Sequence, residues 1–212
     1  MNDRVLVIGA TRGTGLLIAN LLVQHGYRVR AVARNEAEAK RRLGAGIEVV
    51  AADVTKPDTL RAAVKDVDHV MFTAGVTKRP AGEQIVIATE YDGVRNTLAA
   101  GKQAGLGGRF LYMTSIGVAQ SSLGATLLNL VKRNTLPWRR RAEDEIRRSG
   151  LTYTIIRAGL LTNARAGTRA IEVSQRDYPL AFKYRIARAD VAEVFVEALK
   201  HPSTAKTTFE VV

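Results

Sequence analysis

The stretch Arg4-Val5-Leu6-Val7-Ile8-Gly9-Ala10-Thr11-Arg12-Gly13-Thr14-Gly15 decides the fold. It opens with a short apolar run, which is the pattern of a parallel strand covered on both faces. Glycines follow, and the apolar-rich residues 13–25 then predict a helix that ends at Gly26. A strand, a glycine turn and a helix in this order make the first unit of a doubly wound α/β fold.

The glycine spacing also predicts a binding site for a dinucleotide. A diphosphate reaches the backbone amides of a helix N-terminus only where no side chain obstructs it. The spacing here is G-x-x-x-G-x-G, which differs from the usual G-x-G-x-x-G. The alternative is a tight turn that binds nothing. We predict that the cofactor contacts in this loop come from Gly9, Thr11, Arg12, Gly13, Thr14 and Gly15.

Beyond the first helix, strand-like and helix-like segments alternate on the scale of βαβ units. Further strands are expected at residues 28–33, 47–51, 69–73, 109–114, 153–157 and 208–212, and further helices at 36–43, 58–64, 82–104, 139–148 and 189–200. The pattern loosens after Ser115, so the segments 115–137 and 158–188 are expected to form substrate loops. The sequence thus predicts one domain over residues 1–212, an α/β Rossmann-type doubly wound parallel sheet with substrate loops in its C-terminal part.

Composition agrees with a single globular domain. The chain has 212 residues, of which 46% are hydrophobic and 25% charged. The absence of Cys excludes disulfides, thiolate zinc sites and cysteine nucleophiles, and three scattered His residues predict no metal site. No apolar run approaches the about 20 residues of a membrane helix, and the N-terminus lacks a signal-peptide pattern. We therefore expect a cytoplasmic protein without a membrane span.

The charge balance is unusual, because 32 Lys and Arg residues stand against 20 Asp and Glu residues and give a net charge of +12. Such an excess favours an anionic partner. The basic run over residues 132–148 contains only one aromatic residue, Trp138, whereas single-strand binders use several. A solvated helix face is the simpler interpretation, so nucleic acid is not the expected partner.

The end of the second predicted strand bears on which dinucleotide is bound. Folds specific for NAD place an acidic residue there, but this chain has Arg34. A guanidinium binds a 2′-phosphate through two hydrogen bonds, and Arg12 can supply a second charge. These residues favour NADP(H), while the alternative is that both arginines belong to an ordinary Arg-rich surface.

Longer motifs resemble the short-chain dehydrogenase/reductase superfamily, specifically its atypical, NmrA-like and NAD(P)H-binding members. The segment Arg109-Phe110-Leu111-Tyr112-Met113-Thr114-Ser115 is similar to the fifth strand of that family, which ends in the active-site serine. The segment Ser149-Gly150-Leu151-Thr152-Tyr153-Thr154-Ile155-Ile156-Arg157-Ala158-Gly159 resembles the S-G-L-x-Y-T-I-x-R-P-G signature, with Ala158 in the place of Pro. The segment Ile186-Ala187-Arg188-Ala189-Asp190-Val191-Ala192 matches the I-x-R-x-D-V-A start of a helix.

The resemblance implies roles for several positions. By that likeness Asp53 and Val54 contact the adenine, and Ala74 and Gly75 line the adenosine ribose. Ser115 becomes the candidate catalytic residue. The resemblance further implies nicotinamide-side contacts from Arg139, Ala158 and Leu160.

The chain departs from the family at the proton donor. Catalytic members use a Tyr with a Lys four residues later, and none of the six tyrosines here has one. The segment Arg139-Arg140-Arg141-Ala142-Glu143 is similar to the K-x-x-A-E part of the family signature. Alignment from this segment puts Thr135 in the place of the Tyr and Arg139 in the place of the Lys. Counting forward from Ser115 gives Leu128 and Lys132 instead. Arg139 can hold the nicotinamide ribose but cannot release a proton. The proton must come from Ser115, water, the substrate or a loop residue, with Tyr178 and Tyr184 as further candidates or as pocket lining.

Two functions remain open at this point. The first is an NADPH-dependent oxidoreductase for a small carbonyl-, quinone- or flavin-like acceptor, since such acceptors need no obligatory enzyme acid. The alternative is a non-catalytic NADP(H)-binding redox sensor or scaffold protein. The substrate is not defined by the sequence, and either a monomer or a homodimer is compatible with it.

Overall fold

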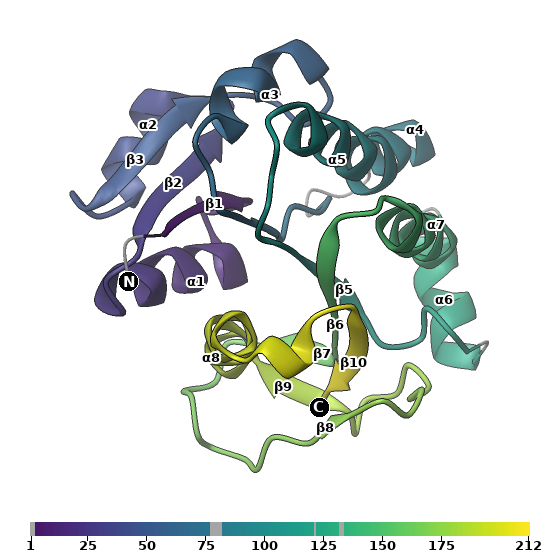
Figure 1. Ribbon diagram of the computed structural model, residues 1–212. Coiled ribbons are helices and arrows are strands. Elements are labelled where there is room, and N and C mark those ends of the chain that lie inside the picture. The colour runs from purple at the N-terminus through teal and green to yellow at the C-terminus, as the bar shows by residue number, and fades with distance from the viewer. Residues whose placement is uncertain (1–2, 77–81, 121, 132–133) are drawn as a thin grey trace.

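The structure, a computed structural model, describes residues 3–76, 82–120, 122–131 and 134–212. Its centre is an eight-stranded sheet with the order β3-β2-β1-β4-β5-β6-β10-β8 (Figure 1). All neighbouring pairs are parallel except β10 with β8. The strands are β1 (Arg4–Ile8), β2 (Arg28–Ala33), β3 (Ile47–Ala51), β4 (His69–Phe72), β5 (Arg109–Ser115), β6 (Thr152–Ala158), β8 (Val173–Ser174) and β10 (Thr207–Val211).

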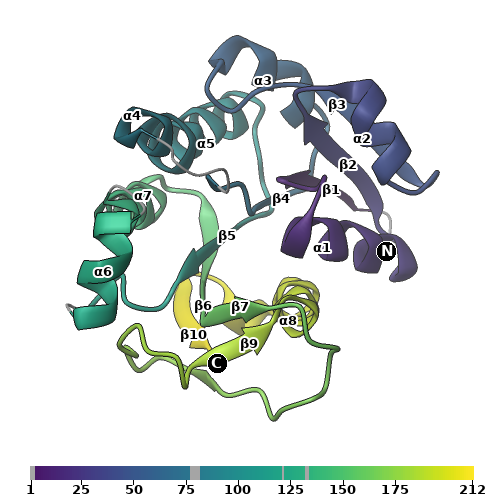
Figure 2. The ribbon, with the colours of Figure 1, turned by 180° about the vertical axis from the view of Figure 1, so that it is seen from behind.

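Helices cover both faces of the sheet, as Figures 1 and 2 show from opposite sides. One face packs against α1 (Gly13–Gln24), α2 (Glu36–Arg42) and α8 (Arg188–Lys200). The other face packs against α3 (Pro57–Val64), α5 (Gly93–Gln103) and α7 (Thr135–Arg148). The short helices α4 (Glu83–Val86) and α6 (Leu123–Val131) lie beside α7, and a 3₁₀ turn (Pro202–Thr204) precedes β10.

The packing of β1 explains its unbroken apolar sequence. Val5 and Val7 belong to the core cluster under α1 and α8, whereas Leu6 and Ile8 belong to the cluster under α3, α5 and α7. All four side chains are buried. Because successive residues of a strand point to opposite faces, a strand covered on both sides must be apolar throughout. The predicted doubly wound α/β fold is confirmed.

The strand order reverses direction between β1 and β4. From β1 the chain proceeds outward to β2 and β3, and from β4 it proceeds the other way to β5 and β6. The crevice at the carboxyl ends of β1 and β4 is therefore the switch point at which such sheets bind ligands. Thr73, just beyond β4, closes the base of this crevice because its N–H and Oγ1 each donate to the Ile8 carbonyl at 2.9 Å.

Three short strands and one helix were not predicted. β7 (Leu160–Thr162) and β9 (Arg185–Ala187) form a separate two-stranded parallel sheet. Strand β8 and helix α6 also lie in segments expected to be irregular loops. Such short strands exist only through their pairing partners, so their own sequences carry little periodicity.

The expected helix at residues 82–104 is interrupted. It consists of α4, a π-helical segment (Ile87–Asp92) and α5. A π-turn inserts one residue into the helical repeat, a change that hydrophobic periodicity does not reveal. Helix α7 also begins at Thr135, earlier than the predicted start at Arg139, because Pro137 lies in the first turn, where its missing N–H costs no hydrogen bond. Most other boundaries agree with the prediction to within one or two residues.

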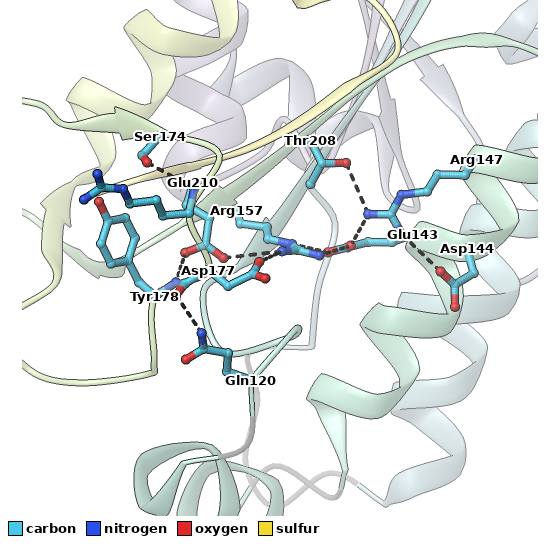
Figure 3. A network of polar contacts seen from close by, with 11 residues as sticks. Gln120, Glu143, Asp144, Arg147, Arg157, Ser174, Asp177, Tyr178, Thr208 and Glu210 are labelled. Atoms are coloured by element: carbon cyan, nitrogen blue, oxygen red, sulfur yellow. Dashed lines mark hydrogen bonds and ion pairs between the residues drawn. The ribbon is translucent and has the colours of Figure 1, made fainter.

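The two expected substrate segments, 115–137 and 158–188, pack against each other. A small apolar cluster joins Ile116, Val118 and Leu136 of the first segment to Leu180 of the second. The second segment is also tied to the sheet by ion pairs around Arg157, shown in Figure 3.

The Arg157 guanidinium bonds three carboxylates, those of Glu143, Asp177 and Glu210. Glu143 and Glu210 are buried, and Glu210 accepts from the Tyr178 N–H at 2.5 Å. These bonds fix the course of residues 177–180 over the sheet edge (Figure 3).

None of the helices in the described ranges has both the length and the apolar character to cross a bilayer.

Candidate nucleotide-binding and active site

Glycine is required at particular positions of the loop after β1. Gly9 and Gly13 have φ angles of +93° and +56°, a region that favours glycine. A Cβ on Gly15 would overlap the Gly9 carbonyl oxygen and lie 2.5 Å from Thr73 Oγ1. The turn, the first helical turn and Thr73 beyond β4 are therefore in close contact.

The N-terminus of α1 is open toward this crevice. Its N-cap residue, Arg12, is extended and makes no side-chain cap hydrogen bond, and the first turn contains no acidic residue. The first amides of a helix without a cap need acceptors from outside the helix, and the helix dipole favours an anion there. Thr14 is 3% exposed, and its Oγ1 has no hydrogen-bond partner among the described residues. An orphaned hydroxyl beside open amides fits a phosphate oxygen.

Arg188 brings a cation to the same loop from the C-terminal half of the chain. Its Nε lies 3.7 Å from the position of a Cβ on Gly13. Its Nη1 donates to Asn163 Oδ1 at 2.7 Å, which fixes the guanidinium. In the sequence Arg188 belongs only to a helix-start motif, and nothing in that motif indicates this contact.

The residues expected on the adenine side lie at the ends of β2 and β3. Asp53 Oδ1 accepts from the Thr55 N–H and Oγ1, both at 2.9 Å. Val54 is buried and packs closely on Gly93 of α5. Arg34 is exposed directly after β2, and within the described part of the chain its guanidinium forms no ion pair. The 2′-phosphate role of Arg34 stays a prediction.

The residues expected on the nicotinamide side converge at the carboxyl ends of β5 and β6, beside Gly75. Arg139 Nη1 donates to Ser115 Oγ at 3.3 Å, and Nη2 is 3.3 Å from the position of a Cβ on Gly75. Ser115 pairs with Ala158 in the sheet. Leu160 follows at the start of β7 and donates its N–H to the Tyr184 carbonyl at 2.8 Å. These residues are far apart in the sequence, so local patterns do not group them. Only the family resemblance implied that they lie together.

Glu90 is the site residue that sequence reasoning missed. It lies in the π-helical segment, is 3% exposed and accepts from Arg139 Nε at 2.8 Å. Burial raises the pKa of Glu90, but the adjacent Arg139 charge and its hydrogen bonds outweigh burial and hold that pKa below its ordinary value. The buried carboxylate is therefore ionised at neutral pH.

Tyr178 and Tyr184, the two further candidates for the proton donor, lie against each other. The Tyr178 hydroxyl donates to Glu172, and this bond raises its pKa. The Tyr184 ring packs on Tyr178, with ring centres 4.8 Å apart. Tyr112 is buried within the sheet, and desolvation raises its pKa. One alignment puts Thr135 and Arg139 in the places of the Tyr and the Lys, and both of these side chains bond Glu90. The other alignment gives Leu128 and Lys132, and Lys132 lies outside the described residues.

A small cavity, separate from the Ser115 and Arg139 pair, lies within the second substrate segment. It has a volume of about 190 Å³ and is lined by residues from the 162–171 loop, β9 and the start of α8. Asp190 borders it and accepts from the Gly167 N–H at 2.8 Å. The predicted segment 158–188 thus encloses space close to the end of the chain.

A doubly wound sheet with an open glycine loop at its switch point defines a Rossmann-type nucleotide-binding protein. Residues 9–202 match the family described as NAD(P)H-binding. The chain belongs to this family.

Individual relatives agree with that membership. Sanguinarine reductase from Eschscholzia californica is 29% identical over 97% of this chain and 87% of its own length. An uncharacterized chloroplastic protein of Arabidopsis thaliana is 31% identical over 92% of this chain, which spans only 65% of that relative. Among solved structures, a putative NAD-dependent epimerase/dehydratase from Bacillus halodurans superposes with a TM-score of 0.83 at 29% identity, covering 99% of this chain and 94% of that one.

Proposed function

We propose that the protein is an NADPH-dependent reductase for a small carbonyl-, quinone- or flavin-like acceptor. The observation that carries the proposal is the Ser115 and Arg139 pair, 3.3 Å apart at the carboxyl end of β5. A bound NADPH would supply a hydride at this edge. A serine hydroxyl next to a fixed guanidinium can then stabilise negative charge as it develops on an acceptor oxygen or nitrogen.

The glycine loop, the open amides of α1 and the Arg188 guanidinium support binding of the diphosphate. The proposed adenine contacts are Asp53 and Val54, with Arg34 and Arg12 on the 2′-phosphate. Both arginines are exposed, Arg34 directly after β2 and Arg12 at the N-cap of α1, and a guanidinium suits a phosphate. Ala74 and Gly75 are proposed to line the adenosine ribose. The proposed contacts of the nicotinamide half are Ser115, Arg139, Ala158 and Leu160.

The chemistry of the pair selects the acceptor class. Arg139 does not release a proton, because Glu90 raises its pKa despite the opposing effect of burial. A serine hydroxyl alone is a weak acid. Quinone- and flavin-like acceptors suit such a site because their reduced forms are stable as anions and take their proton from water. The similarity to sanguinarine reductase supports a reductive reaction.

NADPH oxidation, followed at the absorbance of the reduced nicotinamide, tests the proposal. We expect turnover with at least one member of a panel of aldehydes, quinones and flavins, and about a hundredfold loss in Ser115→Ala, the usual effect of removing one charge-stabilising donor. Ser149→Ala is the matched control, because Ser149 lies after α7, before β6 begins, and caps a turn there.

Tight NADPH binding without turnover on the whole panel would contradict the reductase and favour the non-catalytic sensor or scaffold. The expectations of a cytoplasmic location, of no nucleic-acid partner and of a monomer or homodimer stay predictions.

A further inference from the structure

Glu90 occupies an unusual backbone position. The segment Ile87–Asp92 is a π-helical turn between α4 and α5. Such turns are rare, and they occur frequently at functional sites because they redirect one side chain out of the regular helical pattern. Here the redirected carboxylate faces α7 and the loop after β4.

Both oxygens of Glu90 are used. Oε2 accepts from Arg139 Nε at 2.8 Å and from Thr135 Oγ1 at 2.5 Å. Oε1 accepts from the Val76 N–H at 2.9 Å. One buried carboxylate therefore joins the first turns of α7 to the backbone just beyond Gly75.

The consequence for Arg139 is a defined orientation. Its Nε is spent on Glu90, so Nη1 and Nη2 face Ser115 and Gly75. A side chain at residue 75 would meet both Nη2 and Glu90 Oε1 at 3.3 Å. The absence of a side chain leaves this edge of the guanidinium accessible, and the Arg139 side chain is 20% exposed.

We propose that Glu90 is a positioning residue, which holds Arg139 so that its terminal nitrogens bind the ribose of the nicotinamide half of the dinucleotide. The inference rests on the proposed function, since it assumes that this half lies over β4 and β5. Glu90 stays ionised and transfers no proton. Because Glu90 fixes the Arg139 side chain before the dinucleotide binds, less side-chain conformational entropy is lost on binding.

Calorimetric titration of the full chain with two probes separates positioning from a general structural role. NADP⁺ reaches the nicotinamide half, whereas adenosine 2′,5′-bisphosphate contains only the adenine half. In Glu90→Gln we expect NADP⁺ affinity to fall about tenfold, as for loss of a hydrogen bond to a charged group, and bisphosphate affinity to change less than about twofold. Equal losses for both probes, or no loss for NADP⁺, would overturn the proposal.

Glu83→Gln is the matched control. Glu83 lies on α4, just before the π-helical turn, and accepts from Trp138 Nε1 of α7 at 3.0 Å, whereas Arg139 bonds Glu90 and Ser115. We expect both affinities to stay unchanged in this variant. A loss of NADP⁺ affinity as large as in Glu90→Gln would show that any weakened contact between these helices suffices, and would contradict a specific role for Glu90.

A second comparison covers the case in which an unpaired Arg139 prevents folding. The double variant Glu90→Gln/Arg139→Gln contains neither of the two buried charges, whereas Arg139→Gln leaves the Glu90 carboxylate without its cation. Because Glu90 acts through Arg139, the double variant should bind NADP⁺ as well as Arg139→Gln does. A further loss would overturn the proposal. NADPH oxidation by the wild type is measured separately. Absence of turnover with normal NADP⁺ binding rejects the reductase function alone. Absence of NADP⁺ binding to the wild type rejects both the reductase function and the positioning role of Glu90.

Discussion

Arg188 of α8 lies against Gly13 of the glycine loop, with Nε 3.7 Å from the position where a Cβ would stand. The two residues belong to opposite ends of the chain, and the packing of α1 on α8 brings them together. Asn163 holds the guanidinium in this place through a bond of 2.7 Å. The crevice therefore has a fixed cation beside the open amides of α1, which the glycine motif itself did not indicate.

Arg188→Met should weaken binding of NADP⁺ and NAD⁺ alike, because the diphosphate is common to both. We expect about a tenfold loss for each, as for one charge-assisted hydrogen bond. Isothermal titration calorimetry measures both affinities. The control is Arg185→Met, an exposed residue of β9 whose guanidinium packs on Phe182. Unchanged binding in Arg188→Met would remove Arg188 from the site.

Gly15→Ala should destabilise the fold, although Ala normally favours a helix over Gly. The new methyl group would overlap the Gly9 carbonyl oxygen and force the loop away from β4. We expect a loss of about 1–3 kcal/mol in the free energy of unfolding, the range for overpacked sites. Urea denaturation measures it, with Gly44→Ala as control because a Cβ there meets nothing within 4 Å. Equal stability of Gly15→Ala and wild type would show that the loop relaxes freely.

The preference between dinucleotides should depend on Arg34. Arg34→Ser removes a fork of donors suited to a 2′-phosphate, so NADP⁺ affinity should fall about tenfold while NAD⁺ affinity stays the same. Arg41→Ser, an exposed change on α2, is the control for lost surface charge. Equal NADP⁺ and NAD⁺ affinity in the wild type would contradict the phosphate role directly.

Stability should decline as the pH falls below 6.5 because of His69. Burial lowers the pKa of His69 below 6.5, although Asp3 opposes the shift, and Nδ1 accepts from the Arg109 N–H at 2.9 Å. The unfolded chain thus binds a proton near pH 6.5 that the folded chain does not. The free energy of unfolding falls from pH 6.5 down to the folded pKa, with a slope of at most about 1.4 kcal/mol per pH unit.

His69→Asn keeps an acceptor for the Arg109 N–H and removes the titration. Urea denaturation between about pH 7 and 5 should therefore show a flatter profile for the variant than for the wild type. Parallel profiles would assign the pH dependence to other groups.

Most strands of the sheet could be predicted from the sequence, because local patterns of apolar residues and glycines determine them. The run Val5 to Ile8 and the glycines after it are sufficient to predict a buried parallel strand and the turn at the switch point. Strands β7 and β9 could not be predicted in this way. They have three residues each and form only because segment 158–188 folds back on itself.

The site, too, has residues that local patterns predict and residues that they do not. Gly9 directly follows β1 and Ser115 ends β5, so their positions at one edge of the sheet were predictable. Glu90 and Arg139 are 49 residues apart, and their contact depends on one inserted residue in a helix. A buried Glu in an otherwise apolar helical repeat is the only local signal, and it does not identify the partner.

Titration of the purified wild-type protein with NADPH, and separately with NADH, tests the central claim most directly. A dinucleotide at the open N-terminus of α1 predicts saturable heat for one site, with the tighter binding for NADPH. Absence of heat and of any thermal stabilisation with both nucleotides would contradict the account.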